Sequence, residues 1–439
     1  MRSTTRQRGL HQGVHHGEED CEEDYEDAAD GSDPRESEGG MPGPDRQEEG
    51  VEEAVETTRA APAEPWALET LFLVVTSACN LRCAYCYNSR ASPARMNWPT
   101  VEAAVARLWA SPARDVSLLI TGGEPLVEFA FVRRVVEYVR ATTPRGRRVE
   151  LHLLTNGTRL GEDAIAFLAW HRVFVQISVD GAEAAQQLRG ARTFRQIDAL
   201  VSHLRRRHRT WFANRVNAAV TLVPGTIPHL AASVDYLLDR SFTDITLSPA
   251  TGDIPGWHDG LLPVLDAQFR LVYRSSLRLY RRTGHVALSL FRKGKPSPYL
   301  PWSARCGVES GRSAVVDVDG QVYGCSPLVG SALDRPAGLL RAASDAMRIG
   351  DVTDPDLGGR LPAYRDALAA TGLFGPREGG YSSYGACRDC AYLGYCGVCP
   401  LSIALAPGAA DPERVPDFIC AFTRVSMKYR HRFPRQPGD

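Results

Sequence analysis

The chain has 439 residues, of which 44% are hydrophobic and 23% are charged, as in an average soluble globular protein. That length is sufficient for two or three domains. No run of residues approaches the roughly 20 apolar residues of a membrane-spanning helix. No apolar segment follows the N-terminal residues MRSTTRQRG, which argues against a secretory signal. We therefore expect a cytoplasmic protein that does not bind a membrane.

Charge is distributed unevenly along the chain. Residues 1–60 contain eighteen Asp or Glu against six Arg, whereas the remainder contains 34 acids against 45 bases. An acidic segment with few aromatic residues cannot bury enough apolar surface to fold, so residues 1–66 are predicted to be a disordered tail. One hypothesis is that the tail shields the basic body until an acidic partner displaces it. The basic residues are spread along the chain without an RNP-like or helix-turn-helix motif, so no nucleic-acid partner is expected.

From about Pro65, short runs of β-forming residues alternate with segments of helical periodicity. The predicted strands are Leu71–Val75, Val116–Ile120, Glu150–Leu154, Val173–Ser178, Val216–Leu222 and Asp244–Ser248. The predicted helices between them are Thr100–Trp109, Val127–Arg140, Asp163–Trp170, Phe194–Arg206 and Ile227–Leu238. This alternation predicts βαβ units and a parallel sheet. Six repeats favour a partial (β/α)6 barrel over a closed eight-stranded one.

Clusters of turn-forming residues follow the predicted strands. They are Thr121–Pro125, Thr155–Thr158, Asp180-Gly181 and Pro224-Gly225. In α/β barrels the functional residues lie on the loops after the carboxyl ends of the strands. The functional residues of this half of the chain are therefore expected in these loops.

The pattern changes after a further predicted helix at Leu262–Arg282. Ser313–Val318 and Gln321–Cys325 flank Asp319-Gly320, a sequence that predicts a tight hairpin because Gly accepts positive φ. From about Pro301 the chain is rich in Gly, Pro and Cys. We expect little apolar core there and metal sites that act as staples.

No general acid or base has a recognisable sequence signature. Asp317, Asp319 and Tyr323 lie near the predicted hairpin and are interpreted as solvated turn residues. The catalytic residues are therefore left unassigned.

The cysteines are grouped, with only Cys21 alone in the acidic segment. In a chain without an export signal, clustered cysteines indicate metal ligands before disulfides. The first group, CNLRCAYC at residues 79–86, directly follows the first predicted strand. Three thiolates can hold three corners of an iron–sulfur cubane and leave the fourth iron open to a small molecule, whereas electron-transfer clusters are normally fully ligated. The alternative, a structural zinc site, lacks its fourth ligand.

This arrangement resembles the radical S-adenosylmethionine (SAM) superfamily, whose members carry such a cysteine motif after the first strand of a partial (β/α)6 barrel. The resemblance covers roughly residues 67–250. It implies that Cys79, Cys83 and Cys86 bind a [4Fe–4S] cluster and that the open iron binds SAM. Reductive cleavage of SAM would then produce a 5′-deoxyadenosyl radical that abstracts hydrogen from the substrate.

The resemblance also implies a set of SAM contacts. The GGEP motif, from Gly122 through Gly123 and Glu124 to Pro125, matches the segment that contacts the methionyl amine. Tyr85 matches the aromatic residue near the adenine. The SxDG-like segment with Ser178 and Asp180 lies by the ribose and carboxylate in the family. Asn156 and Arg189 fall near other positions at which the family often contacts SAM.

The C-terminal cysteines resemble the SPASM extension, which adds two auxiliary [4Fe–4S] clusters to radical SAM enzymes that modify peptides and proteins. Cys306 and Cys325 match its first half, while the spacing between Cys396 and Cys399 is one residue shorter than the family pattern. The resemblance implies that Cys306, Cys325 and Cys399 hold the first auxiliary cluster and that Cys387, Cys390, Cys396 and Cys420 hold the second. A further hypothesis is an open or non-cysteine iron site in the first auxiliary cluster. The counter-interpretation is structural zinc of the CxxC…CxxC type.

The predicted domains are therefore the tail at 1–66, the radical SAM barrel with its connecting helix at 67–300, and the SPASM domain at 301–439. The leading hypothesis is a maturase that forms an oxidative carbon–carbon, carbon–sulfur or similar cross-link in a ribosomally made precursor peptide. Its expected partners are that peptide, a reductant such as ferredoxin or flavodoxin, and a separate leader-binding protein.

Two alternatives remain open at this point. One is an anaerobic sulfatase-maturing enzyme that generates formylglycine, although Cys325 is followed by Ser326-Pro327 where that branch typically has an Asp that acts as base. The other is a non-catalytic iron–sulfur redox scaffold. Intact SAM motifs argue against the scaffold.

Overall fold

The computed structural model describes a defined part of the chain. These residues are 66–88, 93–250, 254–292, 308, 311–332, 338–370, 390 and 417–436. Residues 1–65, and with them nearly all of the predicted acidic tail, lie outside this part. The same is true of Cys306, Cys387, Cys396 and Cys399.

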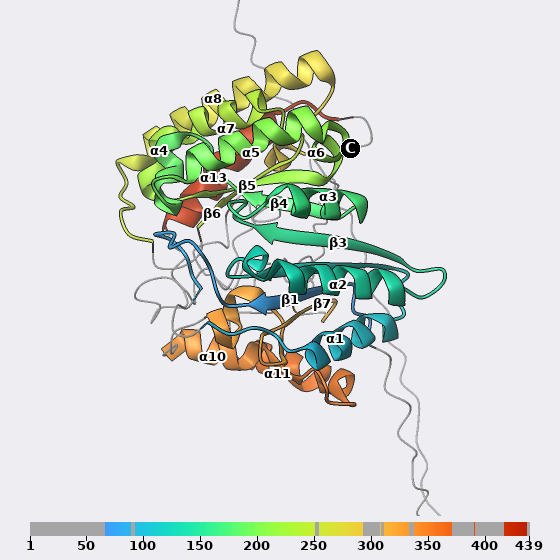
Figure 1. The fold of residues 1–439 in the computed structure, drawn as a ribbon. Coiled ribbons are helices and arrows are strands. Elements are labelled where there is room, and N and C mark those ends of the chain that lie inside the picture. Colours follow the sequence, from blue (N-terminus) through green and yellow to red (C-terminus); the bar gives the residue numbers. More distant parts are fainter. Residues whose placement is uncertain are drawn as a thin grey trace, which may run out of the picture. The chain divides into compact units, whose positions relative to one another are not determined.

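Within the described residues, strands form one sheet in the order β6-β5-β4-β3-β2-β1-β7-β8-β9 (Figure 1). The strands are β1 (Thr70–Thr76), β2 (Asp115–Gly122), β3 (Arg148–Thr155), β4 (Phe174–Ser178), β5 (Val216–Leu222), β6 (Ile245–Pro249), β7 (Ser313–Val316), β8 (Gln321–Tyr323) and β9 (Arg348–Asp351). Every neighbouring pair from β1 to β6 is parallel. This confirms the predicted α/β class with six parallel strands in an unclosed arrangement.

Helices connect the strands in chain order. The α-helices are α1 (Trp98–Ala110), α2 (Phe129–Thr142), α3 (Glu162–Trp170), α4 (Glu183–Gln186), α5 (Thr193–Arg207), α6 (Arg209–Arg215), α7 (Leu230–Asp239), α8 (Leu261–Thr283), α10 (Gly338–Met347), α11 (Leu361–Ala370) and α13 (Asp417–Arg432). Short 3-10 helices are η1 (Pro125–Glu128), η2 (Gln187–Arg189), η3 (Pro224–His229), η4 (Ser289–Phe291), η5 (Ser326–Leu328), η6 (Gly330–Ala332) and η7 (Leu357–Arg360). None of the helices in the described part is long and apolar enough to cross a membrane.

Helix α1 illustrates how local sequence sets an element. The side chain of Asn97 accepts a hydrogen bond from the Thr100 N–H at 2.9 Å, which satisfies one of the free donors at a helix start. A proline follows within the first turn, where its missing N–H costs nothing. The buried positions of the helix are Thr100, Val101, Ala104, Val105 and Leu108, spaced so that they lie along one face.

The predicted hairpin is confirmed, and it extends the barrel sheet. Strand β7 pairs with β8 in antiparallel fashion, and its other side pairs in parallel with β1, Thr70 opposite Ser313. Strand β9, which the sequence pattern missed, completes this edge by pairing with β8. Helices α10 and α11, orange in Figure 1, contact β9 at this edge of the sheet, and α13, red in Figure 1, packs against α8. Helix α13 also contacts β6.

The expectation of little apolar core after Pro301 was wrong for the described residues. Buried side chains of this region belong to the same cluster as the barrel core; they include Ala314, Val315, Val316, Val322, Leu328, Met347, Ile349, Leu357, Leu361, Leu368, Phe422 and Phe433. The apolar positions lie on short strands and short helices separated by Gly and Pro, so their periodicity is interrupted before it becomes visible in the sequence.

Two of the three residues interpreted as solvated at the hairpin are buried. Asp317 is fully buried, and its carboxylate accepts hydrogen bonds from the Ser331 and Val318 N–H groups, both at 2.8 Å. Burial raises the pKa of Asp317. Tyr323 is also buried, whereas Asp319 is exposed as expected. The expectation was wrong because η6 folds back over the hairpin and brings Ser331 to Asp317.

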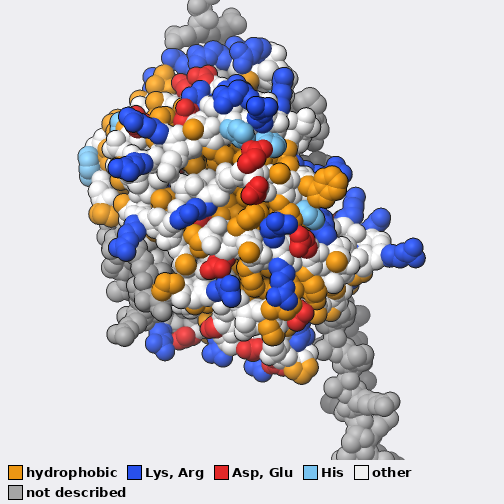
Figure 2. Space-filling model, in the orientation of Figure 1, with side chains coloured by type: hydrophobic (Ala, Val, Ile, Leu, Met, Phe, Trp, Pro, Cys, Tyr) orange, Lys and Arg blue, Asp and Glu red, His pale blue; other side chains and the backbone are white. Residues whose placement is uncertain are grey.

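Charged side chains are spread over the surface. In Figure 2, Lys and Arg side chains are scattered over the visible face, with acidic and hydrophobic groups between them. This agrees with the dispersed basic residues of the sequence.

Aromatic side chains pack the residue that follows α13 against α8 and η4. Phe433 is 1% exposed, and its ring stacks on Phe291 with centroids 4.9 Å apart. Tyr273 and Tyr280 of α8 contact the same ring. Phe269 of α8 also meets Phe422 of α13.

We predict that Phe433→Ala destabilises the fold by about 3–5 kcal/mol, because it leaves a cavity among three aromatic rings. The shift of the urea unfolding midpoint measures this loss. Trp170→Ala is the matched control, since its indole is 83% exposed, and it should leave the midpoint unchanged. Equal shifts in the two variants would contradict the assigned packing.

Candidate functional site

The loop after β1 carries the first cysteine group, Cys79, Cys83 and Cys86. Cys79 and Cys86 are exposed and Cys83 is partly buried. The Ala84 N–H attaches the loop to the segment after β4 by donating to the Leu188 carbonyl at 2.8 Å, and within the loop the Leu81 N–H donates to Cys79 Sγ at 3.4 Å. Three accessible thiols from one short loop therefore face a common region at the carboxyl end of β1.

Partial shielding from water by neighbouring groups raises the pKa of both Cys83, which is partly buried, and Cys79, although the Cys79 side chain is still exposed at the surface. Arg189 partly opposes this at Cys83. Thiols of this kind become strong ligands when a metal displaces their protons. Three cysteines are the donor set of an iron–sulfur cluster with one non-cysteine position, so the residues present fit such a group. The three cysteine sulfurs that ligate a cubane cluster bind three different irons, so these sulfurs need not lie close to one another.

Gly122, the last residue of β2, and Gly123 are required because two segments of the backbone approach each other closely here. The Gly123 N–H donates to the Thr76 carbonyl at 2.8 Å, and the Glu124 N–H donates to the Ala78 carbonyl at 2.8 Å. A Cβ at Gly122 would lie 2.2 Å from the Thr76 oxygen, and one at Gly123 would lie 2.4 Å from the Ala78 oxygen. Side chains at either position would push the cysteine loop away from β2.

Glu124 joins this loop to the next one. Its carboxylate is fully buried and accepts from the Leu126 N–H at 3.0 Å, the Thr155 hydroxyl at 2.6 Å and the Asn156 N–H at 2.6 Å. Burial raises its pKa, against the effect of these hydrogen bonds. The Glu124 side chain thus positions the loop after β3, while the backbone of its motif lies against the cysteine loop.

Asn156 reaches back to the cysteine loop. Its amide group donates to the Asn80 side-chain oxygen at 3.0 Å and lies 3.9 Å from Cys79 Sγ. The Asn80 amide in turn donates to the Thr158 hydroxyl at 2.8 Å. The loops after β1 and β3 are therefore directly connected beside the first cysteine.

The carboxylate of Asp180, after β4, is the centre of a buried network. Arg189 is paired with it through two hydrogen bonds of 2.9 Å, and the Thr221 N–H donates to it at 3.0 Å. The Tyr85 hydroxyl donates to the same carboxylate. The Arg189 guanidinium also lies 5.3 Å from the centre of the Tyr85 ring. Both Asp180 and Arg189 are buried.

This network has clear electrostatic consequences. Burial is the main cause of the raised pKa of Tyr85. Burial by itself would lower the pKa of Arg189, but the charge and hydrogen bonds of Asp180, together with the electrostatic effects of Tyr85 and Cys83, outweigh it and the net pKa is raised. The tyrosine is therefore neutral and the arginine charged. Tyr85 is thereby held in one orientation beside the cysteines.

The structure brings together most of the predicted SAM-binding residues. Tyr85, Gly122, Gly123, Glu124 and Asn156 are linked through the cysteine loop and its neighbours. Asp180 and Arg189 are joined to them through Tyr85. Ser178 lies at the end of β4 and is partly buried, but no described contact connects it to the cysteine loop. Their contacts with SAM remain predictions.

Several members of the site were missed by sequence reasoning. Gln186 accepts from the Asp180 N–H at 2.7 Å, and Thr221 and Thr155 are the partners already described. All are ordinary polar residues at strand or helix ends, and no sequence signal separates them from solvated side chains.

Tyr87 is a further residue that was missed. It is 43% exposed and directly follows Cys86. The Ser326 side chain lies in hydrogen-bonding range of its hydroxyl, and the sulfurs of Cys325 and Cys86 act on it electrostatically. Partial shielding of the hydroxyl from bulk water, together with the charges of the Cys325 and Cys86 sulfurs, raises the pKa of Tyr87 to about 12. Cys325, the residue directly before η5, therefore lies near the first cysteine loop. The sequence signal for Tyr87 was its position directly after the cysteine motif.

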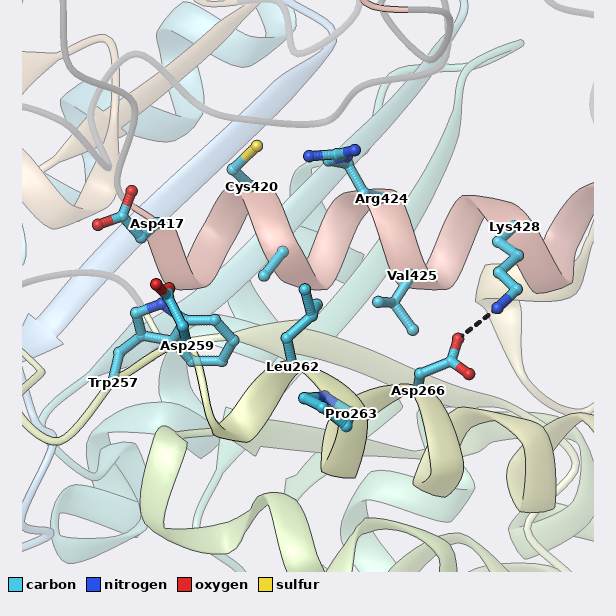
Figure 3. A pocket seen from close by; sticks show the side chains of 11 residues that line it. Trp257, Asp259, Leu262, Pro263, Asp266, Asp417, Cys420, Arg424, Val425 and Lys428 are labelled. Atoms are coloured by element: carbon cyan, nitrogen blue, oxygen red, sulfur yellow. Dashed lines mark hydrogen bonds and ion pairs between the residues drawn. The ribbon is translucent and has the colours of Figure 1, made fainter.

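The remaining described cysteines are Cys390 and Cys420, both partly buried. Cys420 lies on α13 and lines a cavity of about 520 Å³ between α13 and the start of α8 (Figure 3). Its walls include Trp257, Leu262 and Arg424, and at one end Lys428 pairs with Asp266 at 2.7 Å. The predicted grouping of the auxiliary cysteines rests largely on residues outside the described part and stays a prediction.

Comparison with known proteins adds to this geometry. The model of the radical SAM superfamily matches residues 73–225, the stretch that carries the cysteine loop, the glycine motif and Asp180. The serine-type anaerobic sulfatase-maturating enzyme of Klebsiella aerogenes is 24% identical over 289 residues, which is 62% of this chain and 69% of the relative. The cysteine-type enzyme of Clostridium perfringens (strain 13 / Type A) is 25% identical over 282 residues, 59% of this chain and 74% of the relative.

Solved structures show the same fold. Native anSMEcpe with bound AdoMet and Kp18Cys peptide has a TM-score of 0.62 at 17% identity, covering 83% of this chain and 97% of that one. Streptococcus suis SuiB bound to precursor peptide SuiA has a TM-score of 0.52 at 13% identity, covering 81% and 76%. At these identities the likeness concerns the fold alone.

We predict that Gly122→Ala lowers the iron bound per chain after cluster reconstitution, because its Cβ collides with the Thr76 carbonyl and displaces the cysteine loop. Iron content by colorimetric assay is the measurement. Gly225→Ala is the control, since a Cβ there meets nothing within 4 Å. Full iron content in Gly122→Ala would refute the close approach.

We also predict that Asp180→Asn costs about 3–5 kcal/mol of stability, because it leaves the buried Arg189 charge without its partner. Urea unfolding of the variant measures the loss. Asp115→Asn breaks an exposed pair with Arg148 and should have no measurable effect. Comparable midpoints for the two variants would show that the Asp180 network is dispensable.

Proposed function

We propose that this chain is a radical SAM maturase that oxidises a ribosomally made precursor peptide and joins two of its side chains by a carbon–carbon, carbon–sulfur or similar bond. The match of residues 73–225 to the radical SAM superfamily model supports this proposal. The observation that carries the proposal is the cysteine loop itself. It presents three accessible thiols at the carboxyl edge of the sheet, and the loops after β2, β3 and β4 lock it in place.

In this proposal the residues of the chain would have the following roles. Cys79, Cys83 and Cys86 would hold the cluster, and the backbone of Gly122 and Gly123 would lie along bound SAM. Tyr85, fixed by Asp180, would present its ring to the adenine. Asn156 stands beside Cys79, where the amino-acid end of SAM would bind.

The bound groups would supply the radical chemistry. The reduced cluster with SAM would provide a 5′-deoxyadenosyl radical for one hydrogen atom of the peptide, and auxiliary clusters would take up the second electron while its proton goes to solvent. The protein's role is to orient the peptide carbon and to exclude water from it.

The cysteines of residues 301–439 support a SPASM domain. Cys306, Cys325 and Cys399 would hold the first auxiliary cluster, and Cys387, Cys390, Cys396 and Cys420 the second. The position of Cys325 near Tyr87 and Cys86 supports an auxiliary cluster close to the radical site. A ferredoxin or flavodoxin would reduce the SAM-binding cluster. A separate leader-binding protein would deliver the precursor.

Formylglycine formation is the second candidate, and the names of the sulfatase-maturating relatives favour it. The contrary observation is local. Ser326 follows Cys325, and its hydroxyl cannot replace a carboxylate base. Ser326 instead lies against Tyr87. We therefore rank peptide cross-linking first.

The test is the intact mass of short peptides encoded beside the gene, co-expressed with the enzyme and iron–sulfur assembly factors. We expect one peptide to lose two hydrogens without gaining an aldehyde. The loss should disappear with Cys79→Ala and persist with Cys21→Ala, the matched control outside the cysteine groups.

Other outcomes discriminate between the candidates. An aldehyde that reacts with a hydrazide would establish formylglycine formation instead. Deoxyadenosine production without any peptide change would retain the radical SAM domain and overturn the proposed substrate. Absence of deoxyadenosine from a fully iron-loaded enzyme would favour a non-catalytic scaffold.

A further inference from the structure

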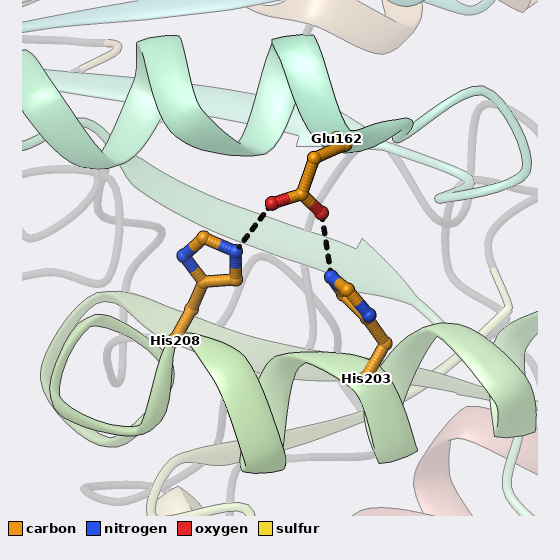
Figure 4. A group of neighbouring side chains, drawn as sticks. All are labelled: Glu162, His203 and His208. Atoms are coloured by element: carbon orange, nitrogen blue, oxygen red, sulfur yellow. Dashed lines mark hydrogen bonds and ion pairs between the residues drawn. The ribbon is translucent and has the colours of Figure 1, made fainter.

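Two histidines and a glutamate converge outside the cysteine site. Glu162 is the first residue of α3, His203 lies on α5, and His208 lies between α5 and α6. His203 Nε2 is 2.6 Å from one Glu162 carboxylate oxygen, and His208 Nε2 is 3.1 Å from the other. Figure 4 shows both imidazoles directed at the carboxylate from the opposite helix.

The backbone holds the histidines in this arrangement. The His208 N–H donates to the Leu204 carbonyl at 2.8 Å, and the Phe212 N–H donates to the His208 carbonyl at 2.8 Å. His208 therefore closes one helix and opens the next. Its ring centre lies 5.7 Å from that of His203, so both rings stay on the side of α5 that faces α3.

The donor atoms suit a transition-metal ion. One ligand atom from each residue lies within 4.8 Å of the other two, and this is the only such group among the described residues. Ligands bound at about 2.0–2.2 Å to one Zn²⁺ lie roughly 3–4 Å from each other. The observed separations of 2.6 and 3.1 Å need only a small opening of the side chains to admit an ion.

The accessibility and charge of the group agree with a metal site. Glu162 is exposed, whereas the two histidines are partly covered, so an ion can enter from solvent. Hydrogen bonds from His208 and His203 hold the pKa of Glu162 below its usual range, so the carboxylate is ionised at neutral pH.

We propose that Glu162, His203 and His208 bind a divalent transition-metal ion of the Zn²⁺ class, with water in the fourth position. Two imidazoles and one carboxylate are typical ligands of such ions, whereas Mg²⁺ prefers oxygen ligands alone. Bound metal ties α3 to the α5–α6 junction. The last turn of α5 also carries Arg205, Arg206 and Arg207, whose positive charges disfavour a nearby cation and would weaken its binding.

The test uses the iron–sulfur-loaded holoenzyme, freed of loose metal with a chelator and dialysed against ZnCl2. Elemental analysis then gives Zn and Fe per chain. We expect about one more Zn²⁺ per chain in the wild type than in His203→Gln or Glu162→Gln, because each variant removes one of three ligands. The iron content should be equal in all samples, which excludes exchange at the cysteines.

His152→Gln is the matched control. His152 is a partly buried histidine 3.6 Å from Glu150, but no second histidine joins this pair in the described structure. Its removal should leave the Zn content unchanged. Zn²⁺, but not Mg²⁺, should also raise the thermal unfolding temperature of the wild type and of His152→Gln.

Two results would overturn the proposal. Equal Zn content in the wild type and in the three variants would reduce the group to a hydrogen-bonded ion pair. A thermal shift by Zn²⁺ that survives both His203→Gln and Glu162→Gln would place the bound ion elsewhere. Circular dichroism of each variant shows that it is folded.

Discussion

The arrangement of the site depends on one buried carboxylate. Asp180 follows β4, yet it binds Tyr85 from the loop after β1, Arg189 from η2 and the Thr221 backbone on β5. A charge withdrawn from water this completely is stable only if its partners satisfy it. The loop after β1, the segment after β4 and strand β5 are therefore held in one relative position. The orientation of Tyr85, and with it the cysteine loop, follows from that requirement.

A second constraint acts from the opposite side of the loop. The Gly122-Gly123 backbone lies so close to Thr76 and Ala78 that no side chain fits between them, and Glu124 extends the contact to Thr155. The cysteine loop is thus gripped between the loops after β2 and β4. Its sulfurs nevertheless remain accessible. A rigid frame around accessible side chains is the arrangement that a precisely positioned functional site requires, and it suits the proposed role of this loop.

The C-terminal residues take part in the same frame. Strand β7 pairs with β1, so the hairpin that precedes Cys325 is fixed by the strand that precedes Cys79. Tyr87 and Ser326 meet where these two segments end. Helix α13 packs on α8 through Phe422, and Phe433, directly after α13, contacts α8 as well. The two predicted domains are thus built on one continuous sheet, which places Cys325 near the first loop without any long-range hinge.

The sequence by itself determined the features that repeat locally. Strand and helix periodicity predicted the parallel strands and their connecting helices, and Asp319-Gly320 predicted the hairpin. The cysteine spacing with the glycine motif predicts a metal site, and that role stays a prediction. Only the tertiary structure decided that Asp317 is buried, that Asp180 joins Tyr85 to Arg189, that β7 adds to β1, and that Glu162 meets two histidines. These contacts join residues far apart in the chain. A polar side chain has the same local pattern whether it is solvated or buried, so only the packed fold distinguishes the two.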